Sequence, residues 1–262
     1  MMTGSLTVIG IGPGALALTT PAASEALERA DVILGYKTYV GLIDGVAPQV
    51  PRETSGMRSE VARSTRAIEL AHAGKRVVLV SGGDPGVYGM AGLVFEVLRE
   101  QGRDDIAVEI VPGVPALCAA AALLGAPLMH DFAAVSLSDL LLPLDAILRR
   151  LDLAAQADFV LCLYNPQGRN RTEPFQRACE ALARHRAPST PVGIVRSAYR
   201  EGQAVTITTL AELPQAGVDM TTLVVVGNSR TFVHNGRMVT PRGYSDKYTL
   251  GCASNGLPAD ET

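Results

Sequence analysis

Short runs of apolar, β-branched residues alternate along almost the whole chain with stretches in which apolar residues recur at helical spacing. In the first half, strands are predicted at residues 5–11, 31–35, 76–81 and 108–111. Helices are predicted between them at residues 21–30, 58–75 and 93–102. Thr20 and Pro21 predict the start of the first helix, because threonine caps a helix and proline suits its first turn.

A second series of elements follows residues 115–125, which are apolar on every side and predict a buried helix at the seam between two lobes. Strands are predicted at residues 133–138, 158–165, 191–197, 204–210 and 221–228, and helices at residues 144–156 and 173–186. Asn235-Gly236 predicts the turn of a hairpin within residues 231–239. This alternation indicates an α/β fold with largely parallel sheets.

The length of the chain agrees with two lobes. Its 262 residues exceed the commonest domain size of roughly 100 to 150 residues. We expect an N-terminal α/β domain at residues 1–120, a C-terminal α/β domain at residues 121–249 and a mobile tail at residues 250–262.

Composition excludes several classes of protein. Hydrophobic residues make up 47% and charged residues 19% of the chain, which is typical of a globular protein. A net charge of −3 argues against a nucleic-acid binder that depends on phosphate neutralisation. The longest apolar run, residues 116–129, is interrupted by Gly125 and Pro127 and is shorter than the roughly 20 residues of a membrane span. We therefore expect no nucleic-acid partner and no membrane partner.

The ends and the metal-binding residue types add two further expectations. The first residues carry no basic segment ahead of an apolar core, so we expect no signal peptide and a cytoplasmic location. The four cysteines and four histidines lack the spacing of a metal site or of a disulfide framework. No bound metal is expected.

Glycine-rich turns follow three of the predicted strands, and the first has two interpretations. GIGPGA (residues 10–15) fits the dinucleotide fingerprint, with Asp31 near the spacing of its acidic residue. That interpretation predicts an NAD(P)-dependent oxidoreductase. Against it, Pro13 removes a backbone N–H where a pyrophosphate needs donors, and Asp31 stands before the second strand instead of at its carboxyl end. A tight strand-to-loop turn is the other interpretation.

The second turn, SGGDPGVYGM (residues 81–90), points more strongly to a ligand. Gly82 and Gly83 carry no Cβ, so a ligand could lie against bare backbone. Asp84 could accept from ligand hydroxyls or an amine, or bond within its own loop. A third turn, VPGVPA (residues 111–116), again follows a strand, and none of the three is a phosphate loop. Three such turns predict a binding cleft at the carboxyl edge of a sheet.

Motifs along the chain carry a family resemblance. They are VIGIGPG, ADVILGYKTYV, SGGDPGVYGMAG, VPGVPALCAAAALLGAPLMHDFAAVSLSDLL, ADFVLCLYNPQGRNR, TPVGIVRSAYREGQ and TTLVVVGNS. Together, from about Leu6 to Thr231, they resemble the S-adenosylmethionine-dependent tetrapyrrole methyltransferases. GIGPG and GGDPGVYG occur in members that methylate various tetrapyrrole positions, whereas GYKTYV, LGAPLMHDFAAVSLSDLL and LYNPQGRNR are most similar to members that methylate C17 of precorrin-3B and contract the ring in cobalamin biosynthesis. Leu144 stands where the resemblance predicts a tryptophan.

Several alternatives stay open beside this assignment. Within the family they are methylation at C11 or C20 of a precorrin, and a cobalt-containing substrate, cobalt-factor III. Outside it they are the oxidoreductase that uses GIGPGA and a non-catalytic S-adenosylmethionine binder.

The resemblance implies two unequal α/β lobes with S-adenosylmethionine in the cleft between them, a tetrapyrrole substrate and a homodimer. The cofactor contacts that it implies are Pro13, Gly82, Gly83, Asp84, Val87, Tyr88, Pro115, Ala116, Tyr164 and Ala198.

Ring contraction also needs proton transfers, and the substrate carries many carboxylates. Candidates for acid–base roles near the expected cleft are Asp84, Tyr88, His130, Asp131, Ser136 and Asp139. Arginines at or just past strand ends are the candidates for pairing with substrate carboxylates: Arg169, Arg171, Arg196 and Arg200. The helical Arg177, Arg184 and Arg186 are expected on the solvated surface.

Overall fold

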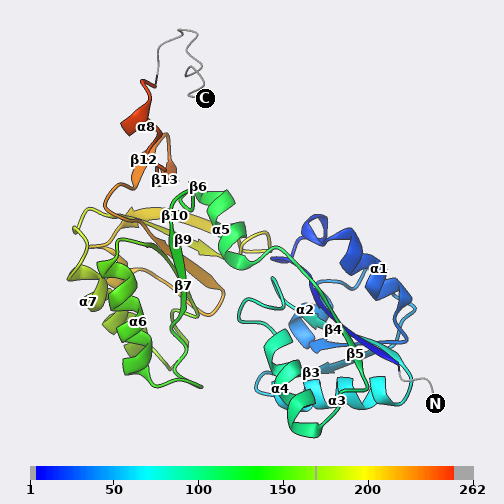
Figure 1. Cartoon of the computed structure of the whole chain (residues 1–262). Helices are drawn as coiled ribbons and strands as arrows, with labels where there is room; N and C mark the ends of the chain where they lie inside the picture. The colour runs from blue at the N-terminus through cyan, green and yellow to red at the C-terminus, as the bar shows by residue number, and fades with distance from the viewer. Residues whose placement is uncertain (1–3, 169, 251–262) are drawn as a thin grey trace, which may run out of the picture.

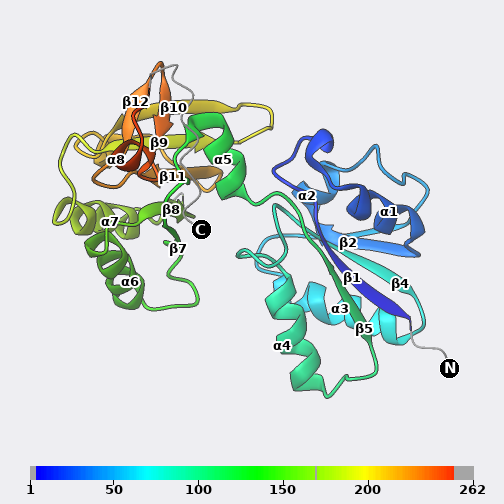
Figure 2. The ribbon, with the colours of Figure 1, turned by 45° about the horizontal axis from the view of Figure 1, so that its top comes forward.

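The computed structural model describes residues 4–168 and 170–250, which form two α/β lobes, each built around its own sheet. Figures 1 and 2 show the first lobe, in blue and cyan, beside the second, in green to orange. An extended segment, residues 112–115, joins them between β5 and α5 (Figure 1). The predicted two-lobed α/β fold is confirmed.

The first sheet is wholly parallel, with strand order β3-β2-β4-β1-β5. Its strands are β1 (Ser5–Gly10), β2 (Val32–Tyr36), β3 (Arg52–Ser55), β4 (Arg76–Ser81) and β5 (Ala107–Val111). Its helices are α1 (Pro21–Arg29), α2 (Lys37–Gly41), α3 (Glu60–His72) and α4 (Ala91–Gln101), with a 3-10 turn η1 (Leu16–Leu18). Helices α3 and α4 pack on one face and α1 on the other. The carboxyl ends of all its strands therefore meet at one edge.

In this lobe the helix-capping signal predicts the start of α1 correctly, whereas two short elements are not predicted. The Thr20 side chain accepts a hydrogen bond from the backbone N–H of Ala23 at 3.2 Å, so the predicted cap of α1 is confirmed. The sequence pattern predicts neither β3 nor α2. Strand β3 is a polar edge strand without a fully buried residue, so it has no hydrophobic pattern to detect.

The second sheet is mixed, with strand order β10-β9-β11-β8-β7. Its strands are β7 (Phe132–Ser136), β8 (Val160–Tyr164), β9 (Pro191–Arg196), β10 (Ala204–Thr209) and β11 (Thr222–Val226). Its helices are α5 (Ala116–Leu124), α6 (Leu144–Gln156) and α7 (Glu173–Ala183), with a 3-10 turn η2 (Leu213–Gln215). Among neighbouring strands in the described part of this sheet, only β7 and β8 are parallel. The prediction of largely parallel sheets is therefore right for the first sheet and wrong for the second, because connections without an α-helix join β9 to β10 and β10 to β11.

A small third sheet combines β12 (Phe232–His234), β13 (Arg237–Val239) and β6 (Gly125–Ala126), and α8 (Tyr244–Lys247) follows it. Asn235 and Gly236 have φ values of 47° and 69°, the left-handed conformation that a two-residue hairpin turn needs at both positions. The predicted hairpin is confirmed. The predicted tail lies outside the described residues from residue 251 onward.

Helix α5 lies on the second sheet with one face. Leu117, Ala120 and Leu124 pack with side chains of β8, β9 and β11. Cys118 and Ala122 are exposed, so the prediction of a helix buried on every side is right for one face only. The expected domain boundary after residue 120 falls within this helix.

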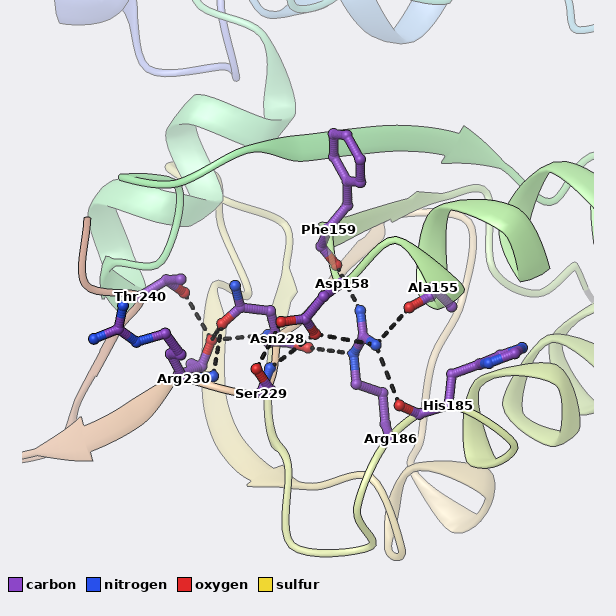
Figure 3. Close-up of polar contacts among 11 residues, drawn as sticks. Ala155, Asp158, Phe159, His185, Arg186, Asn228, Ser229, Arg230 and Thr240 are labelled. Carbon is purple, nitrogen blue, oxygen red and sulfur yellow. Dashed lines mark hydrogen bonds and ion pairs between the residues drawn. The ribbon is translucent and has the colours of Figure 1, made fainter. Parts of the chain in front are cut away.

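Arg186 is buried in the second lobe, with only 7% of its surface exposed, so its predicted place on the solvated surface is wrong. Its guanidinium donates to the carbonyl oxygens of Ala155 (2.6 Å), Phe159 (2.9 Å) and Gly227 (3.3 Å), as Figure 3 shows. It also lies 3.2 Å from the carboxylate of Asp158. Burial lowers its pKa. The guanidinium is buried because the ends of three elements leave carbonyl groups that need donors.

Candidate active site between the lobes

The three glycine-rich turns follow the adjacent strands β4, β1 and β5 and touch one another through their backbones. Gly12 and Gly83 exchange two backbone hydrogen bonds, with N···O distances of 3.1 and 2.8 Å. A Cβ on Gly113 would lie 2.3 Å from the carbonyl oxygen of Gly83 and 2.7 Å from that of Gly10. Since no side chain fits so close to backbone, contact between the turns itself requires glycine. The turns form one floor of backbone at the carboxyl edge of the first sheet.

Asp84 ties this floor together. Its Oδ1 accepts from the backbone N–H of Gly86 at 2.8 Å, and its Oδ2 accepts from that of Gly113 at 3.1 Å. Of the two roles left open for this carboxylate, the structure shows bonding within the loops. One side chain thus holds the second turn against the third.

The ring of Tyr39 packs against Gly82 of the second turn. A Cβ on Gly82 would lie 2.6 Å from the Tyr39 ring, which also packs edge-on against Tyr36 with centroids 5.4 Å apart. Tyr39 lies within the motif GYKTYV, which carries part of the family resemblance, but no role is predicted for it from the sequence. Two aromatic residues three positions apart directly after a strand were the available signal.

The second lobe faces the floor with the carboxyl ends of β7, β8 and β9, which point to the same edge of the mixed sheet. Val87 from the second turn, Tyr164 at the end of β8 and Ala198 after β9 pack against one buried cluster of α5, β8, β9 and β11. Residues from both lobes, each predicted to contact a cofactor, therefore come together.

Tyr88 and Tyr164 bridge the lobes with their rings. The Tyr88 hydroxyl donates to the carbonyl oxygen of Ala134 in β7 at 3.0 Å, and the two ring centroids lie 5.0 Å apart. The Tyr164 hydroxyl accepts from the backbone N–H of Leu117 in the first turn of α5, at 3.0 Å. Burial raises the pKa of both phenols, so both are protonated at neutral pH.

Arg200 crosses from the loop after β9 to the first turn. Its Nε donates to the carbonyl oxygen of Pro13, and its guanidinium carbon lies 5.6 Å from the centroid of the Tyr39 ring. The position of a Cβ on Gly83 lies 3.7 Å from Pro115 Cα and from Ala116 N, which places the third turn beside the second. Every predicted cofactor residue therefore lies on the floor or on the loops that face it.

Strained backbone occurs in the same loops. Four of the eight described residues other than glycine that adopt a left-handed φ lie here: Tyr88 (52°), Asn165 (52°), Ser197 (48°) and Tyr199 (55°). Such conformations cost about 1–3 kcal/mol each and cluster at functional sites. The strain therefore supports a binding role for these loops, although sequence gave no sign of it.

Arg171, predicted to meet substrate carboxylates, joins two loops of the second lobe. It donates to the carbonyl oxygens of Leu137 at 2.6 Å and Asn165 at 2.9 Å. It also lies 3.7 Å from Asp139, whose buried Oδ1 has no hydrogen-bond partner in the described part of the chain. Ser136 accepts from the Asn165 side chain at 3.0 Å. Ser136 and Asp139 thus lie at the carboxyl end of β7, on loops that Arg171 holds.

His130 and Asp131 lie at the opposite, amino end of β7. The strand between them and Ser136 is five residues long, roughly 16 Å at 3.3 Å per residue. The backbone N–H of Asp131 donates to Nδ1 of His130 at 2.8 Å. The structure does not bring this pair together with the other acid–base candidates. Arg196 is exposed at the end of β9, and Arg169 lies outside the described residues.

Asp31 does not serve a nucleotide in this fold. It stands at the amino end of β2, where the Arg76 guanidinium pairs with it at 2.6 Å and the Arg76 backbone N–H donates to it at 2.8 Å. Arg76 lowers the pKa of Asp31 to about 2. The acid that the dinucleotide fingerprint needs is therefore on the wrong edge of the sheet and already paired.

Two further findings concern the part of the chain that the structure describes. None of its helices is both long and apolar enough to cross a membrane. No three of its histidine, cysteine and carboxylate side chains gather in a group that could hold a metal ion.

The two α/β lobes and the glycine-rich turns between them define an α/β protein with a candidate ligand site, and comparison with known proteins identifies it as a methyltransferase and gives the family. The family model of the tetrapyrrole (corrin/porphyrin) methylases matches residues 5–214. The chain belongs to this family. It is similar to the solved structure of the methyltransferase CobJ, with a TM-score of 0.86 and 39% identity over 91% of this chain and all of that one. The uroporphyrin-III C-methyltransferase of Thermus thermophilus, solved in complex with S-adenyl homocysteine, is 25% identical over 86% of this chain and 97% of its own, with a TM-score of 0.65.

Relatives with curated names divide between two substrates. The probable cobalt-factor III C(17)-methyltransferase of Salmonella typhimurium is 49% identical over 92% of this chain and 99% of its own. The cobalt-factor III methyltransferase of Priestia megaterium is 48% identical over 95% of this chain, which spans only 47% of that relative. The precorrin-3B C(17)-methyltransferase of Sinorhizobium sp is 40% identical over 93% of this chain and 98% of its own.

Proposed function

We propose that this protein transfers a methyl group from S-adenosylmethionine to C17 of precorrin-3B, or of its cobalt-containing counterpart cobalt-factor III, and contracts the macrocycle in cobalamin biosynthesis. The observation that carries the proposal is the floor of three glycine turns facing the strand ends of a second lobe. Relatives named for C17 methylation, which match 92% and 93% of the chain, support the position of transfer.

The residues of the cleft fit S-adenosylmethionine. Gly82, Gly83 and the third turn present mainly backbone to the space between the lobes, since a Cβ on Gly83 would already touch Pro115 and Ala116 at 3.7 Å. Val87 and Tyr164 add apolar walls. A neutral, largely backbone surface suits an adenine ring and a methionine moiety better than a phosphate chain. When bound, the cofactor supplies an electrophilic methyl group on a sulfonium sulfur.

The main contribution of the chain is alignment. Methyl transfer requires the acceptor carbon, the methyl carbon and the sulfur in one line, and orientation of this kind can contribute about 7–11 kcal/mol. Rigid contact between the turns fixes the donor side, because the Asp84 bonds and the Gly12–Gly83 pair leave little room for movement. Loops after β7 and β8 would hold the macrocycle opposite.

Ring contraction expels a bridging carbon as an acetyl group and needs proton transfers at a hydroxyl and a lactone. Tyr88 is a protonated phenol at the cleft, and it would act as a proton donor on releasing its hydrogen bond to the Ala134 carbonyl oxygen. Ser136 and Asp139 lie on the facing loop. We assign proton transfer to these three residues, since Asp84 is engaged by backbone and His130 and Asp131 lie at the other end of β7.

Carboxylates of the substrate would meet the exposed Arg196, since Arg200 is already engaged by the Pro13 carbonyl oxygen. Arg171 would act behind Arg196 by holding the loops, since its side chain is only 17% exposed. Arg169 remains a candidate from the resemblance.

Incubation with S-adenosylmethionine and each purified substrate tests the proposal. We expect a product that has gained one methyl group and has the absorption spectrum of a contracted ring. Methyl gain without contraction would assign the protein to another position of the family. Calorimetric binding of NADH without binding of S-adenosylhomocysteine would overturn methyl transfer itself.

Identity favours the cobalt-containing substrate. Relatives named for cobalt-factor III are 40% to 49% identical, against 40% for the relative named for precorrin-3B. We therefore expect a higher kcat/KM with cobalt-factor III, measured beside precorrin-3B under the same anaerobic conditions.

Assembly and location remain part of the proposal. The family resemblance supports a homodimer in the cytoplasm, and the exposed Phe232 and Val233 of β12, each 46% exposed, offer apolar surface for self-association. Sedimentation equilibrium measures the assembly.

A further inference from the structure

Arg200 makes the longest-range side-chain contact between the two lobes, 187 positions along the chain from its partner Pro13. Its Nε donates to a carbonyl oxygen of the first turn, while its guanidinium lies over the Tyr39 ring. Tyr39 in turn packs against Gly82 of the second turn. One cation from the second lobe is therefore connected to two of the three turns that form the floor.

The backbone on both sides is shaped for this crossing. A Cβ on Gly14 would lie 2.6 Å from Cγ and Nε of Arg200, so only glycine lets the side chain pass. On the other side, the turn that presents Arg200 contains Ser197 and Tyr199, both in the left-handed region. The Gln203 side chain fixes that turn by accepting from the backbone N–H of Tyr199 at 2.7 Å.

The charge of Arg200 has no other use in the described part of the chain, where no carboxylate pairs with it. Most arginines of the second lobe that make ion pairs do so within that lobe, as Arg171 and Arg186 do. Because the guanidinium of Arg200 donates its hydrogen bond to a carbonyl of the opposite lobe, it acts between the lobes.

We propose that Arg200 is a positioning residue that latches the second lobe onto the first and second turns and so closes the cleft over the bound cofactor. Ala198, two residues earlier on the same loop, is a proposed cofactor contact. When Arg200 bonds to Pro13, the loop that carries Ala198 therefore lies against the ligand. The identity of that ligand rests on the proposed function; the latch itself does not.

Hydrogen–deuterium exchange of the unliganded protein tests the latch. Arg200→Gln should raise exchange of the hydrogen-bonded backbone amides of Gly12, Leu18 and Thr19 by about 10- to 100-fold, as expected for loss of a hydrogen bond from a charged group. Arg200→Lys should give a smaller rise, because an ammonium can donate to the carbonyl but cannot lie flat on the ring. Tyr39→Leu should also raise exchange, whereas Tyr39→Phe keeps the ring and should stay within about twofold of wild type. Arg149→Gln, on the exposed face of α6, is the control.

Stopped-flow release of S-adenosylhomocysteine tests the role of the latch toward the cofactor. Arg200→Gln should speed release by about 10- to 100-fold and raise the KM for S-adenosylmethionine by more than it lowers kcat. A purely structural residue would instead lower the midpoint of unfolding and leave this ratio unchanged.

The outcomes separate the two hypotheses. Wild-type exchange in Arg200→Gln and Tyr39→Leu would overturn the latch, whatever happens to ligand release. Faster exchange with unaltered release would overturn its action on the cofactor. Failure of the wild-type protein to bind S-adenosylhomocysteine would overturn the proposed function, while the exchange comparison would still decide the latch.

Discussion

At the scale of single residues, the glycines of the cleft are required first of all for contacts within the protein itself. Gly10, Gly83 and Gly113 allow three turns to touch through their backbones. Gly82 makes room for an aromatic ring from α2 and Gly14 for an arginine from the other lobe. A glycine-rich turn thus indicates that other atoms lie close to its backbone. Here those atoms belong largely to the chain itself.

Replacing Gly113 by alanine should damage the floor. Its Cβ would meet backbone at 2.3 Å, and backbone cannot yield as a flexible side chain does. We expect the free energy of unfolding in urea to fall by about 1–3 kcal/mol and binding of S-adenosylhomocysteine to weaken. Gly92→Ala is the matched control: nothing lies within 4 Å of its Cβ, and in α4 it should raise stability by about 0.5–1 kcal/mol. Equal stability of the two variants would contradict this account.

The residues predicted to contact a cofactor were found from their places after strands, but the bonds that these residues make could not be predicted. Asp84 was placed at the cleft by its position after a strand, yet its bond to Gly113 joins segments 29 positions apart and has no local signal. Arg200 was chosen for its charge, and its contact with Pro13 depends on how the lobes meet. His130 was grouped with Ser136 because they are near in sequence, whereas an intervening strand separates them.

At the scale of elements, strong amphipathic patterns were predicted well. Helix α6 was expected at residues 144–156 and spans those residues, since its apolar side chains recur on one face over more than three turns. The antiparallel pairing of β9, β10 and β11 could not be predicted from strand content, because pairing direction depends on connections through space.

Arg186 joins the ends of three elements of the second lobe through their carbonyl groups. Its removal should lower the free energy of unfolding far more than removal of its neighbour Arg184. Arg186→Met leaves the carbonyl oxygens of Ala155 and Phe159 without their donor and Asp158 without its cation. We expect a loss of about 3–5 kcal/mol in the free energy of unfolding, measured by circular dichroism in urea. Arg184→Met removes only a surface pair with Asp152, from a side chain 60% exposed, and should cost less than about 1 kcal/mol. Similar losses in both variants would show that the buried network contributes little.

At the scale of the whole molecule, each lobe has its own core, and residues 112–115 join the two. Contacts between the lobes include the Tyr88 hydrogen bond to Ala134, the Tyr88–Tyr164 ring pair and the Arg200 hydrogen bond to Pro13. Interfaces of this kind permit relative movement of domains.

Calorimetry should therefore detect both lobes. Without ligand we expect two overlapping unfolding transitions. S-adenosylhomocysteine at a hundred times its Kd should stabilise the protein by about 2.7 kcal/mol and raise both transitions, because the proposed site has walls from both lobes. A shift in one transition alone would place the ligand on a single lobe.

The touching turns also limit how such an enzyme can be redesigned. A floor made of mutually contacting backbone has almost no side chains to exchange, so its shape cannot be adjusted by substitution. Libraries that aim at a different macrocycle or a different methylated carbon should leave residues 10–14, 82–86 and 113 unchanged. They should vary residues 140–143, where Leu140 and Leu141 are 69% and 95% exposed. A constant donor site with a replaceable acceptor wall offers a physical account of how one architecture could methylate many positions of related rings.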